Sequence, residues 1–365
     1  MTNYLLAGGG TAGHVNPLLA LADKLREVEP DAVVFALGTA EGLESRLVPA
    51  RGFELLTVPR LPFPRRPNRD ALRFPGRFRA VVAQIQALIV AREIDVVVGF
   101  GGYVSAPAYL AARRAGVPIV IHEANARPGL ANRLGSRFTR HVGVTFPRTR
   151  LPHARVVGMP LRREIEHLDR HEARREAVAF FGLDPSLLTV MVTGGSLGAA
   201  RLNETISAAA ANILGARWQL LHITGERSQL APSELTGYHL LRYCDRMDLA
   251  LAAADFAVAR AGAATVSELT ALGIPAAYVP LDIGNGEQRL NAQAVVDAGG
   301  ALMVRNSEFT PEWVSGTLVP LLQDRASIAG MAARTSVLGV RDGADRLLAL
   351  VREALGAQAQ QSQEQ

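Results

Sequence analysis

Two glycine-rich segments of the sequence have the composition of anion-binding turns. "AGGGTAGHVN" (residues 7–16) and "TGGSLGAARLN" (residues 193–203) each follow a short apolar run and precede a helical pattern. Glycines let a ligand approach the backbone closely, and the N-terminus of the following helix attracts negative charge. Neither segment ends in the Gly-Lys-Ser/Thr of a P-loop. The first satisfies G-x-G-x-x-G, but the next apolar run ends in Leu37, Gly38 and Thr39, without the acidic residue that holds a ribose in dinucleotide sites. We therefore predict anion binding rather than a nicotinamide or flavin site.

His14 stands where the helix after the first glycine segment is predicted to begin. The helix dipole at that position favours the neutral imidazole, which is the form able to accept a proton. His14 is therefore a candidate general base. A capping or merely exposed histidine is the alternative that the residues alone leave open.

A third segment, "RAGAATVSELTALGIPAAYVP" (residues 260–280), places a carboxylate at a helix start. Its Gly-Ala turn follows an apolar run, and the first helical turns hold Thr265, Ser267 and Glu268. A carboxylate there commonly pairs with the helix dipole. It is also placed to accept two hydrogen bonds from a ribose diol, because ligands of doubly wound sheets bind at the carboxyl ends of strands.

The apolar runs predict an α/β fold made of two doubly wound parallel-sheet domains. Strands are expected in the first half at "NYLLAGG", "AVVFALG", "DVVVGFGG", "PIVIHE" and "HVGVTF", and in the second at "LLTVMVTGG", "WQLLHITG", "HLLRYC", "FAVARAG", "AAYVP" and "ALMVR". These runs are continuous rather than alternating, as expected when helices cover both faces of a sheet. We expect Rossmann-like domains at residues 1–158 and 159–341 that face each other across a cleft, a helix at 342–355 that crosses back to the first domain, and a disordered polar tail at 356–365.

Composition narrows the class of protein. With 365 residues and 48% hydrophobic content, the chain can form two cores. Residues 1–158 hold 21 Lys and Arg against 11 Asp and Glu, and the remaining residues hold 18 against 23. This asymmetry predicts an anionic partner for the first half. The single cysteine excludes an internal disulfide, and we find neither a secretory signal nor an apolar stretch long enough to span a membrane.

The segment "RLPFPRRPNRDALRFPGRFRA" (residues 60–80) carries seven arginines and one acidic residue among leucines and phenylalanines. This mixture suits adsorption to an anionic lipid leaflet. Nucleic acid, which we do not expect, and a plain solvated loop are the alternatives. The residues expected to face lipid are Arg65, Arg66, Arg69, Leu72, Arg73, Phe74, Arg77 and Phe78.

Taken together, the motifs resemble one glycosyltransferase family. Over residues 4–350 the sequence contains, in order, "GGGTAGHVNP", "GFGGYVSAP", "HEANARPGLANR", "GMPLR", "TGGSLGAARLN", "ARAGAATVSEL" and "EQRLNA". Their order and spacing are similar to those of the MurG family, peptidoglycan N-acetylglucosaminyltransferases of the GT-B fold. The resemblance implies inverting transfer of GlcNAc from UDP-GlcNAc to the 4-hydroxyl of MurNAc in undecaprenyl-pyrophosphoryl-MurNAc-pentapeptide (lipid I), which gives lipid II. It also implies a peripheral protein on the cytoplasmic face of the cell membrane, where other cell-wall synthesis proteins are possible partners.

The resemblance also implies residue roles. His14 is the candidate base and Glu123 a lesser candidate. Glu268 would hold the donor ribose, and the backbone at Cys244 would contact the uracil. Contacts to the diphosphate are implied for Arg162, Ser196, Ala263, Ala264, Thr265, Val266 and Ser267. Contacts to the sugar are implied for Asn125 and Gln288, and Thr11, Ala12 and Gly13 would approach both groups.

Some positions depart from the family pattern. Met159, Leu197, Ala261 and Glu287 replace an Asn, a Gln, a Ser and a Gln that are common there. The chain contains no Asp-x-Asp motif, so we expect neither a metal requirement nor a cofactor. Two alternatives remain open: another GT-B enzyme that uses UDP-sugars, such as a glycolipid transferase or a sugar-nucleotide epimerase, and a non-catalytic sugar-nucleotide-binding subunit.

Overall fold

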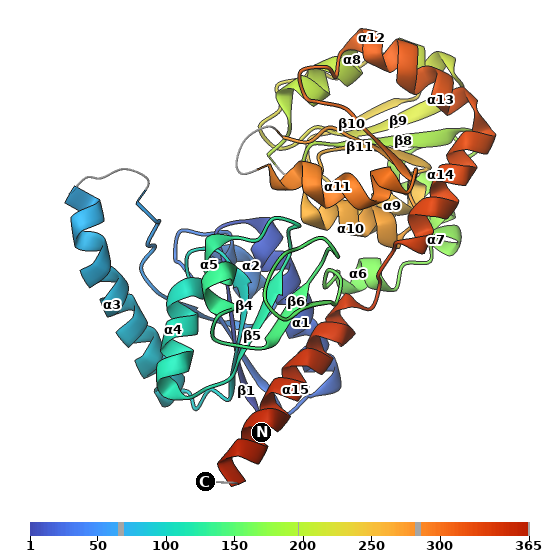
Figure 1. Ribbon diagram of the computed structural model, residues 1–365. Helices are drawn as coiled ribbons and strands as arrows, with labels where there is room; N and C mark the ends of the chain where they lie inside the picture. The colour runs from blue at the N-terminus through green and yellow to red at the C-terminus, as the bar shows by residue number, and fades with distance from the viewer. Residues whose placement is uncertain (65–68, 196, 282–285, 364–365) are drawn as a thin grey trace. The chain divides into compact units, whose positions relative to one another are not determined.

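The computed structural model describes residues 1–64, 69–195, 197–281 and 286–363. The chain forms two compact units (Figure 1). Unit 1 comprises Met1–Arg163 and Arg341–Gln365, and unit 2 comprises Glu164–Val340. Each unit contains one sheet whose strands are all parallel, which confirms the predicted α/β fold class.

The sheet of unit 1 has the strand order β3-β2-β1-β4-β5-β6-β7. Its strands are β1 (Asn3–Gly8), β2 (Val33–Gly38), β3 (Glu54–Thr57), β4 (Val96–Gly101), β5 (Ile119–Glu123), β6 (His141–Val144) and β7 (Ala154–Val156). The sequence patterns predicted five of them. They missed β3 and β7, which are short, lie at the two edges of the sheet and are partly exposed, so neither forms a continuous apolar run.

Helices cover both faces of this sheet. They are α1 (Ala12–Val28), α2 (Glu44–Ala50), α3 (Arg69–Ala91), α4 (Ser105–Ala115), α5 (Leu130–Gly135) and α15 (Gly343–Gln363). One core cluster joins the strands to α1 and α15, and a second joins them to α3 and α4. Apolar side chains are therefore buried on both faces, which explains the continuous apolar runs of the central strands.

Helix α15 packs on unit 1 although it lies at the end of the chain. Leu347 and Val351 are fully buried in the core beside α1. The ion pair between Lys24 and Asp345, at 3.0 Å, adds a polar contact. The helix continues to Gln363, where the polar composition predicts a disordered tail. Alanine and glutamine have high helix propensity, and the Gln358 amide donates to the Gly116 carbonyl at 2.9 Å, so the helix extends past the apolar contacts.

The sheet of unit 2 has the strand order β10-β9-β8-β11-β12-β13. Its strands are β8 (Leu188–Thr193), β9 (Trp218–Ile223), β10 (Tyr238–Leu241), β11 (Phe256–Ala259), β12 (Ala276–Tyr278) and β13 (Ala301–Met303). All six coincide with predicted apolar runs. The helical elements are α6 (Arg163–Glu166), α7 (Arg170–Phe181), α8 (Ala200–Gly215), α9 (Met247–Ala253), α10 (Ala263–Ala271), α11 (Glu287–Asp297), α12 (Pro311–Trp313), the π-helical turn η1 (Val314–Leu318), α13 (Val319–Gln323) and α14 (Arg325–Val337).

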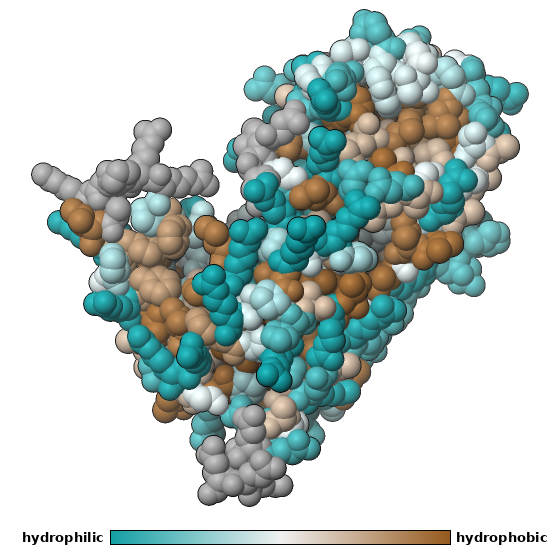
Figure 2. All heavy atoms as spheres, viewed as in Figure 1, coloured by the Kyte–Doolittle hydropathy of each residue, from teal (hydrophilic) through white to brown (hydrophobic). Residues whose placement is uncertain are grey.

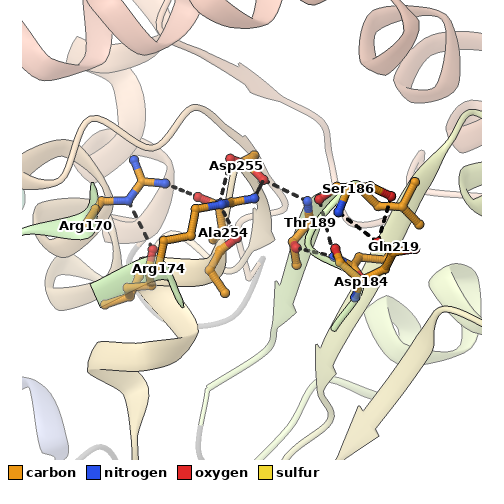
Figure 3. A network of polar contacts seen from close by, with 11 residues as sticks. Arg170, Arg174, Asp184, Ser186, Thr189, Gln219, Ala254 and Asp255 are labelled. Carbon is orange, nitrogen blue, oxygen red and sulfur yellow. Dashed lines mark hydrogen bonds and ion pairs between the residues drawn. The ribbon is translucent and has the colours of Figure 1, made fainter. Parts of the chain in front are cut away.

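A polar network ties α7 to the amino ends of the central strands of unit 2 (Figure 3). The Arg174 guanidinium donates to both oxygens of Asp255, at 3.0 and 2.8 Å, and the Thr189 amide donates to the same carboxylate at 2.9 Å. Arg170 donates to the Leu251 and Leu272 carbonyls. These charge-assisted bonds close the end of the sheet away from the glycine turns, where no chemistry is predicted, so their role is structural.

Both sheets reverse their strand order next to the first strand of each unit. The reversal lies between β1 and β4 in unit 1 and between β8 and β11 in unit 2. Ligands of doubly wound sheets bind at the carboxyl ends of the strands at such a switch point. The glycine segments follow β1, β4, β8 and β11, so the fold places them at the expected binding edges.

Candidate active site

The first glycine turn connects β1 to α1. Gly10 has a φ of +85°, which favours glycine, and Thr11 is the N-cap residue of α1. The Thr11 carbonyl accepts the His14 amide at 3.0 Å. Ala12 and Gly13 stand at the helix start, where amide groups have no partner within the helix. The turn therefore presents amide donors and the positive end of α1 at the edge of the sheet.

A second glycine turn, after β4, packs against the first. A Cβ atom at Gly102 would lie 2.5 Å from the Gly9 carbonyl oxygen, so the two backbones touch. Buried Ser105 fixes this arrangement: its hydroxyl lies 2.9 Å from the Ala7 carbonyl and 2.7 Å from the Gly101 carbonyl, and it accepts the Gly101 amide at 3.0 Å. Sequence reasoning did not single out Ser105, because no motif marks a hydroxyl that acts only on the backbone.

The hydrogen bonds of His14 determine which ring nitrogen carries the proton. Nδ1 lies 3.1 Å from the Gly9 carbonyl oxygen and 3.1 Å from Thr11 Oγ1. A carbonyl oxygen can only accept, so Nδ1 is protonated and Nε2 holds the lone pair. Nε2 faces Gly101, where a Cβ atom would lie 3.0 Å away. The half-buried imidazole thus has the tautomer that a general base requires.

Glu123, the last residue of β5, is buried and receives three donors. They are the Asn125 amide at 2.9 Å, the Gly129 amide at 3.0 Å and the Asn132 side-chain amide at 2.9 Å. Asn132 in turn accepts the Tyr109 hydroxyl at 2.6 Å. Burial, followed by the charge of Glu123, raises the pKa of Tyr109, so this hydroxyl keeps its proton. The carboxylate therefore organises the loop that carries Asn125.

The glycine turn after β8 is equally crowded. Gly195 and Gly198 have φ values of +90° and +83°. A Cβ atom at Gly198 would overlap the Thr224 carbonyl, and one at Gly225 would overlap the Gly198 amide. This turn therefore packs backbone to backbone against the end of β9. Leu197, one of the departures from the family pattern, is 56% exposed on it.

A buried chain of polar side chains supports this turn. The Asn203 amide donates to the Thr224 carbonyl at 2.8 Å, and its oxygen lies 3.1 Å from His222 Nε2. The Tyr238 hydroxyl lies 2.8 Å from His222 Nδ1. Burial lowers the pKa of His222 to about 4, so the ring is neutral near pH 7. One ring nitrogen then donates a hydrogen bond and the other accepts one. A cavity of about 500 Å³ opens beside this chain, lined by residues 197–200, 203, 204, 224 and 227–230.

Another glycine turn of unit 2 joins β11 to α10. Gly262 is the N-cap residue, so the first amides of α10 point toward the switch point. Thr265 and Glu268 are half-buried and accessible. Ala263, Val266 and Ser267 are buried.

The remaining predicted donor-binding residues lie in different segments. Gln288, in the first turn of α11, accepts the Leu281 amide through its side-chain oxygen at 2.9 Å. Cys244 follows β10 and is buried. Arg162 is half-buried and belongs to unit 1. Ser196 lies outside the described residues.

The departures from the family pattern have structural explanations at two positions. Met159 and Ala261 are buried, so each fills a core position rather than facing a ligand. Glu287 is half-buried at the start of α11. Within the described residues, no three His, Cys, Asp or Glu side chains gather into a group that could hold a metal ion.

Within each unit, the fold gathers the predicted residues at one edge. In unit 1 these are Thr11, Ala12, Gly13, His14, Glu123 and Asn125. In unit 2 these are residues 263–268 and Gln288, in the segments that follow the carboxyl ends of β11 and β12. Two doubly wound units of this kind, each with glycine turns at its switch point, form the architecture of nucleotide-binding α/β proteins, the class to which GT-B glycosyltransferases belong.

Comparison with known proteins makes the assignment specific. Residues 4–144 match the glycosyltransferase family 28 N-terminal domain, and residues 189–347 match the glycosyltransferase family 28 C-terminal domain. The chain belongs to glycosyltransferase family 28. It is 64% identical over 98% of its length, and 100% of the relative's, to the UDP-N-acetylglucosamine--N-acetylmuramyl-(pentapeptide) pyrophosphoryl-undecaprenol N-acetylglucosamine transferase of Leifsonia xyli.

Two further relatives agree with this assignment. The transferase of the same name from Streptomyces coelicolor is 52% identical over 98% of this chain and 99% of its own. The crystal structure of MurG from Acinetobacter baumannii superimposes with a TM-score of 0.78 at 28% identity, and it covers 96% of this chain and 100% of that one.

The crowding at Gly198 predicts a large effect of a single methyl group. We expect Gly198→Ala to lower the free energy of unfolding of unit 2 by about 2–5 kcal/mol, because a positive φ costs about 1–2 kcal/mol and overlap with the Thr224 carbonyl adds about 1–3 kcal/mol. Both tryptophans, Trp218 and Trp313, lie in unit 2. Urea unfolding followed by tryptophan fluorescence therefore reports on this unit.

Gly215, the last residue of α8, is the matched control. Nothing surrounds the position that its Cβ would occupy, and its φ is not in the left-handed region. Gly215→Ala should leave stability unchanged or raise it by up to about 1 kcal/mol. Equal effects of the two substitutions would contradict the packing that we describe.

Proposed function

We propose that this protein transfers N-acetylglucosamine from UDP-N-acetylglucosamine to the 4-hydroxyl of the muramyl sugar in the lipid-linked pentapeptide acceptor, lipid I. The observation that carries this function is that relatives at least half identical over nearly the whole chain share this one activity. The site residues support it, because His14 and the glycine turns occupy the switch points where a doubly wound fold binds ligands. The epimerase and the non-catalytic subunit are not favoured.

In the proposed reaction His14 is the general base. Its Nε2 lone pair takes the proton of the acceptor 4-hydroxyl, and the oxygen forms a bond to C1 of the donor sugar. The bond between C1 and the diphosphate oxygen breaks on the opposite face, and its electron pair leaves with UDP. The configuration at C1 is therefore inverted, and one proton passes to His14 for each bond formed.

The leaving diphosphate needs positive charge, which the proposal assigns to protein groups. The amides of the glycine turns, the N-termini of α8 and α10 and the guanidinium of Arg162 stabilise the developing charge. Ser196 adds a hydroxyl in the same role. Glu268 holds the ribose, the loop at Cys244 meets the uracil, and Gln288 and Asn125 hold the sugar. We propose that this set works without a metal ion.

Glu123 is the less favoured base. Its buried carboxylate accepts three hydrogen bonds, and a proton taken from the acceptor would weaken them by removing the negative charge. His14 Nε2 has no such cost, because only Nδ1 bonds to Gly9 and Thr11. We therefore assign Glu123 to positioning Asn125.

A coupled assay tests the reaction. Purified protein incubated with UDP-N-acetylglucosamine and a short-chain lipid I analogue should release UDP only when both substrates are present. Because the charge on the diphosphate is met by amides and arginine, the rate should be unchanged in EDTA. UDP release that does not depend on the acceptor, or no release, would refute the reaction.

His14→Ala tests the base. Loss of a positioned base typically costs about 10²–10⁴-fold in rate, whereas UDP affinity should stay within about twofold, because the imidazole does not enter the donor assignment. Turnover and calorimetric UDP binding measure the two quantities. His167→Ala, at an exposed position, is the control. Wild-type turnover in His14→Ala would remove the assignment.

The acceptor lipid requires contact with a membrane, which we assign to α3 and the segment before it. No helix within the described residues is both long and apolar enough to cross a bilayer. Phe63, Phe74 and Phe78 form an aromatic cluster, with ring centroids 5.0 and 5.7 Å apart. Leu72 is 83% exposed and Phe63 is 64% exposed. Large apolar side chains in water, next to arginines, are typical of surfaces that adsorb to lipid.

One alternative for residues 60–80 was a plain solvated loop. Residues from Arg69 onward form α3, so a plain solvated loop is wrong for this half of the segment. Arg73 and Arg77 are exposed on the helix. Figure 2 shows apolar and polar side chains interspersed on the surface over α3 and α4. Arg65 and Arg66 lie outside the described residues, as does the side chain of Arg69. We propose binding to the anionic cytoplasmic leaflet.

Charge reversal tests this surface. A basic residue near an anionic membrane contributes about 1 kcal/mol, so Arg77→Glu should weaken binding to phosphatidylglycerol vesicles roughly tenfold or more, as measured by co-sedimentation. Arg175→Glu, at an exposed position on α7, changes net charge equally and should bind like the wild type. If vesicle binding is unchanged by added salt and by Arg77→Glu, the electrostatic contribution to membrane binding is excluded.

A further inference from the structure

Glu44 is a buried carboxylate to which the proposed reaction gives no role. It is the first residue of α2 and is 1% exposed. Its Oε1 accepts the Thr39 amide at 2.8 Å and the Thr39 hydroxyl at 2.9 Å, and its Oε2 accepts the Gly10 amide at 2.9 Å. An ionised group in the interior has to be well hydrogen-bonded, and this one receives three donors.

The surrounding backbone is shaped to admit this carboxylate. A Cβ atom at Gly9, Gly38 or Gly42 would overlap the Glu44 side chain. Three glycines from three segments of the chain are therefore required by one side chain. Gly38 ends β2, where a dinucleotide site would place an acid for the ribose. Here the carboxylate comes from Glu44 instead, and its oxygens are occupied by protein donors.

The same peptide group connects Glu44 to His14. The amide N–H of Gly10 donates to Glu44 Oε2 at 2.9 Å, and the carbonyl of Gly9, in the same peptide unit, accepts from His14 Nδ1 at 3.1 Å. Hydrogen bonds in such a chain polarise one another. Because the charged Glu44 carboxylate accepts the Gly10 N–H, the Gly9 carbonyl of the same peptide becomes a stronger acceptor for the proton on His14 Nδ1.

We propose that Glu44 is a positioning residue for His14, acting through the Gly9–Gly10 peptide. It holds the proton on Nδ1, keeps the lone pair on Nε2 and stabilises the imidazolium formed after proton transfer. The arrangement performs the task of the carboxylate that orients a catalytic histidine in hydrolase triads, with a peptide between the two side chains. The inference rests on the proposed role of His14 as base.

The carboxylate remains ionised for this task. Burial alone would raise the pKa of Glu44, but the amide of Gly10, its own amide and the amide and hydroxyl of Thr39 together lower it. The negative charge is thus present near pH 7, where the transferase would act.

The test compares Glu44→Gln with Glu41→Gln. Glutamine keeps the shape of the glutamate side chain but carries no charge. Its NH₂ group cannot accept a hydrogen bond, so at least one of the groups that donate to the carboxylate loses its acceptor. Glu41 is an exposed carboxylate of the same turn and serves as the charge-matched control. We expect kcat to fall at least tenfold in Glu44→Gln, with the donor KM within about twofold of the wild type, and neither to change in Glu41→Gln.

Nitrogen NMR of histidine-labelled protein supplies a readout that does not depend on activity. His14, assigned with His14→Ala, should show the Nδ1-protonated tautomer in the wild type and a mixture of tautomers in Glu44→Gln. Glu44→Asp retains the charge but shortens the reach by one methylene, so it should shift the tautomer in the same direction. It also provides a second variant if Glu44→Gln folds poorly.

Each outcome decides one claim. An unchanged His14 tautomer in both folded Glu44 variants overturns the inference, even if kcat falls, because Glu44 would then act only on the fold. A tautomer shift without loss of kcat also overturns it. Wild-type turnover in His14→Ala refutes the proposed base and, with it, the catalytic role of Glu44, whereas loss of turnover in His14→Ala with an unchanged tautomer in the Glu44 variants refutes the inference alone.

Discussion

Close contact between backbones at the carboxyl ends of parallel strands is the constraint on which the rest of the structure depends. Gly102 touches the Gly9 carbonyl in unit 1, and Gly198 touches Gly225 and the Thr224 carbonyl in unit 2. Contacts of this kind exclude side chains, so a ligand can approach the backbone of the turns closely. The helix that follows each turn adds its positive end. The anion binding predicted from the glycines would therefore need no lysine in either turn.

Polar side chains beneath the turns hold these backbones in place. In unit 1, Ser105 binds the ends of β1 and β4, and Glu44 binds the turn after β1. In unit 2, Asn203 and His222 support the end of β9. Each group satisfies backbone atoms that the close packing would otherwise leave without partners. Rigid turns of this kind keep donors in fixed positions, which is what electrostatic stabilisation of a leaving group requires.

The sequence predicted most of the fold and only part of the site. Continuous apolar runs identify buried parallel strands, so eleven of the thirteen strands in the described part of the chain were predicted, and the edge strands β3 and β7 were not. Motifs singled out His14 and Glu268 as candidates, because glycine turns and helix starts leave local patterns. Glu44, Ser105 and His222 have partners far away in the sequence or act on backbone atoms, so no local pattern marks them. The helical end of α15 was missed because its polar composition is typical of both helix and disorder.

Three glutamates near strand ends show that the same chemical group can have different roles in different surroundings. Glu44 and Glu123 are buried and each accepts three hydrogen bonds from nearby donors, so their negative charge is used inside the protein. Glu268 is half-buried at the start of α10 and remains accessible. A buried carboxylate with its donors in place orients what it touches, whereas an accessible one can exchange water for the hydroxyls of a ligand. Exposure and hydrogen bonding, rather than residue type, therefore separate the groups that build this site from those available to its substrates.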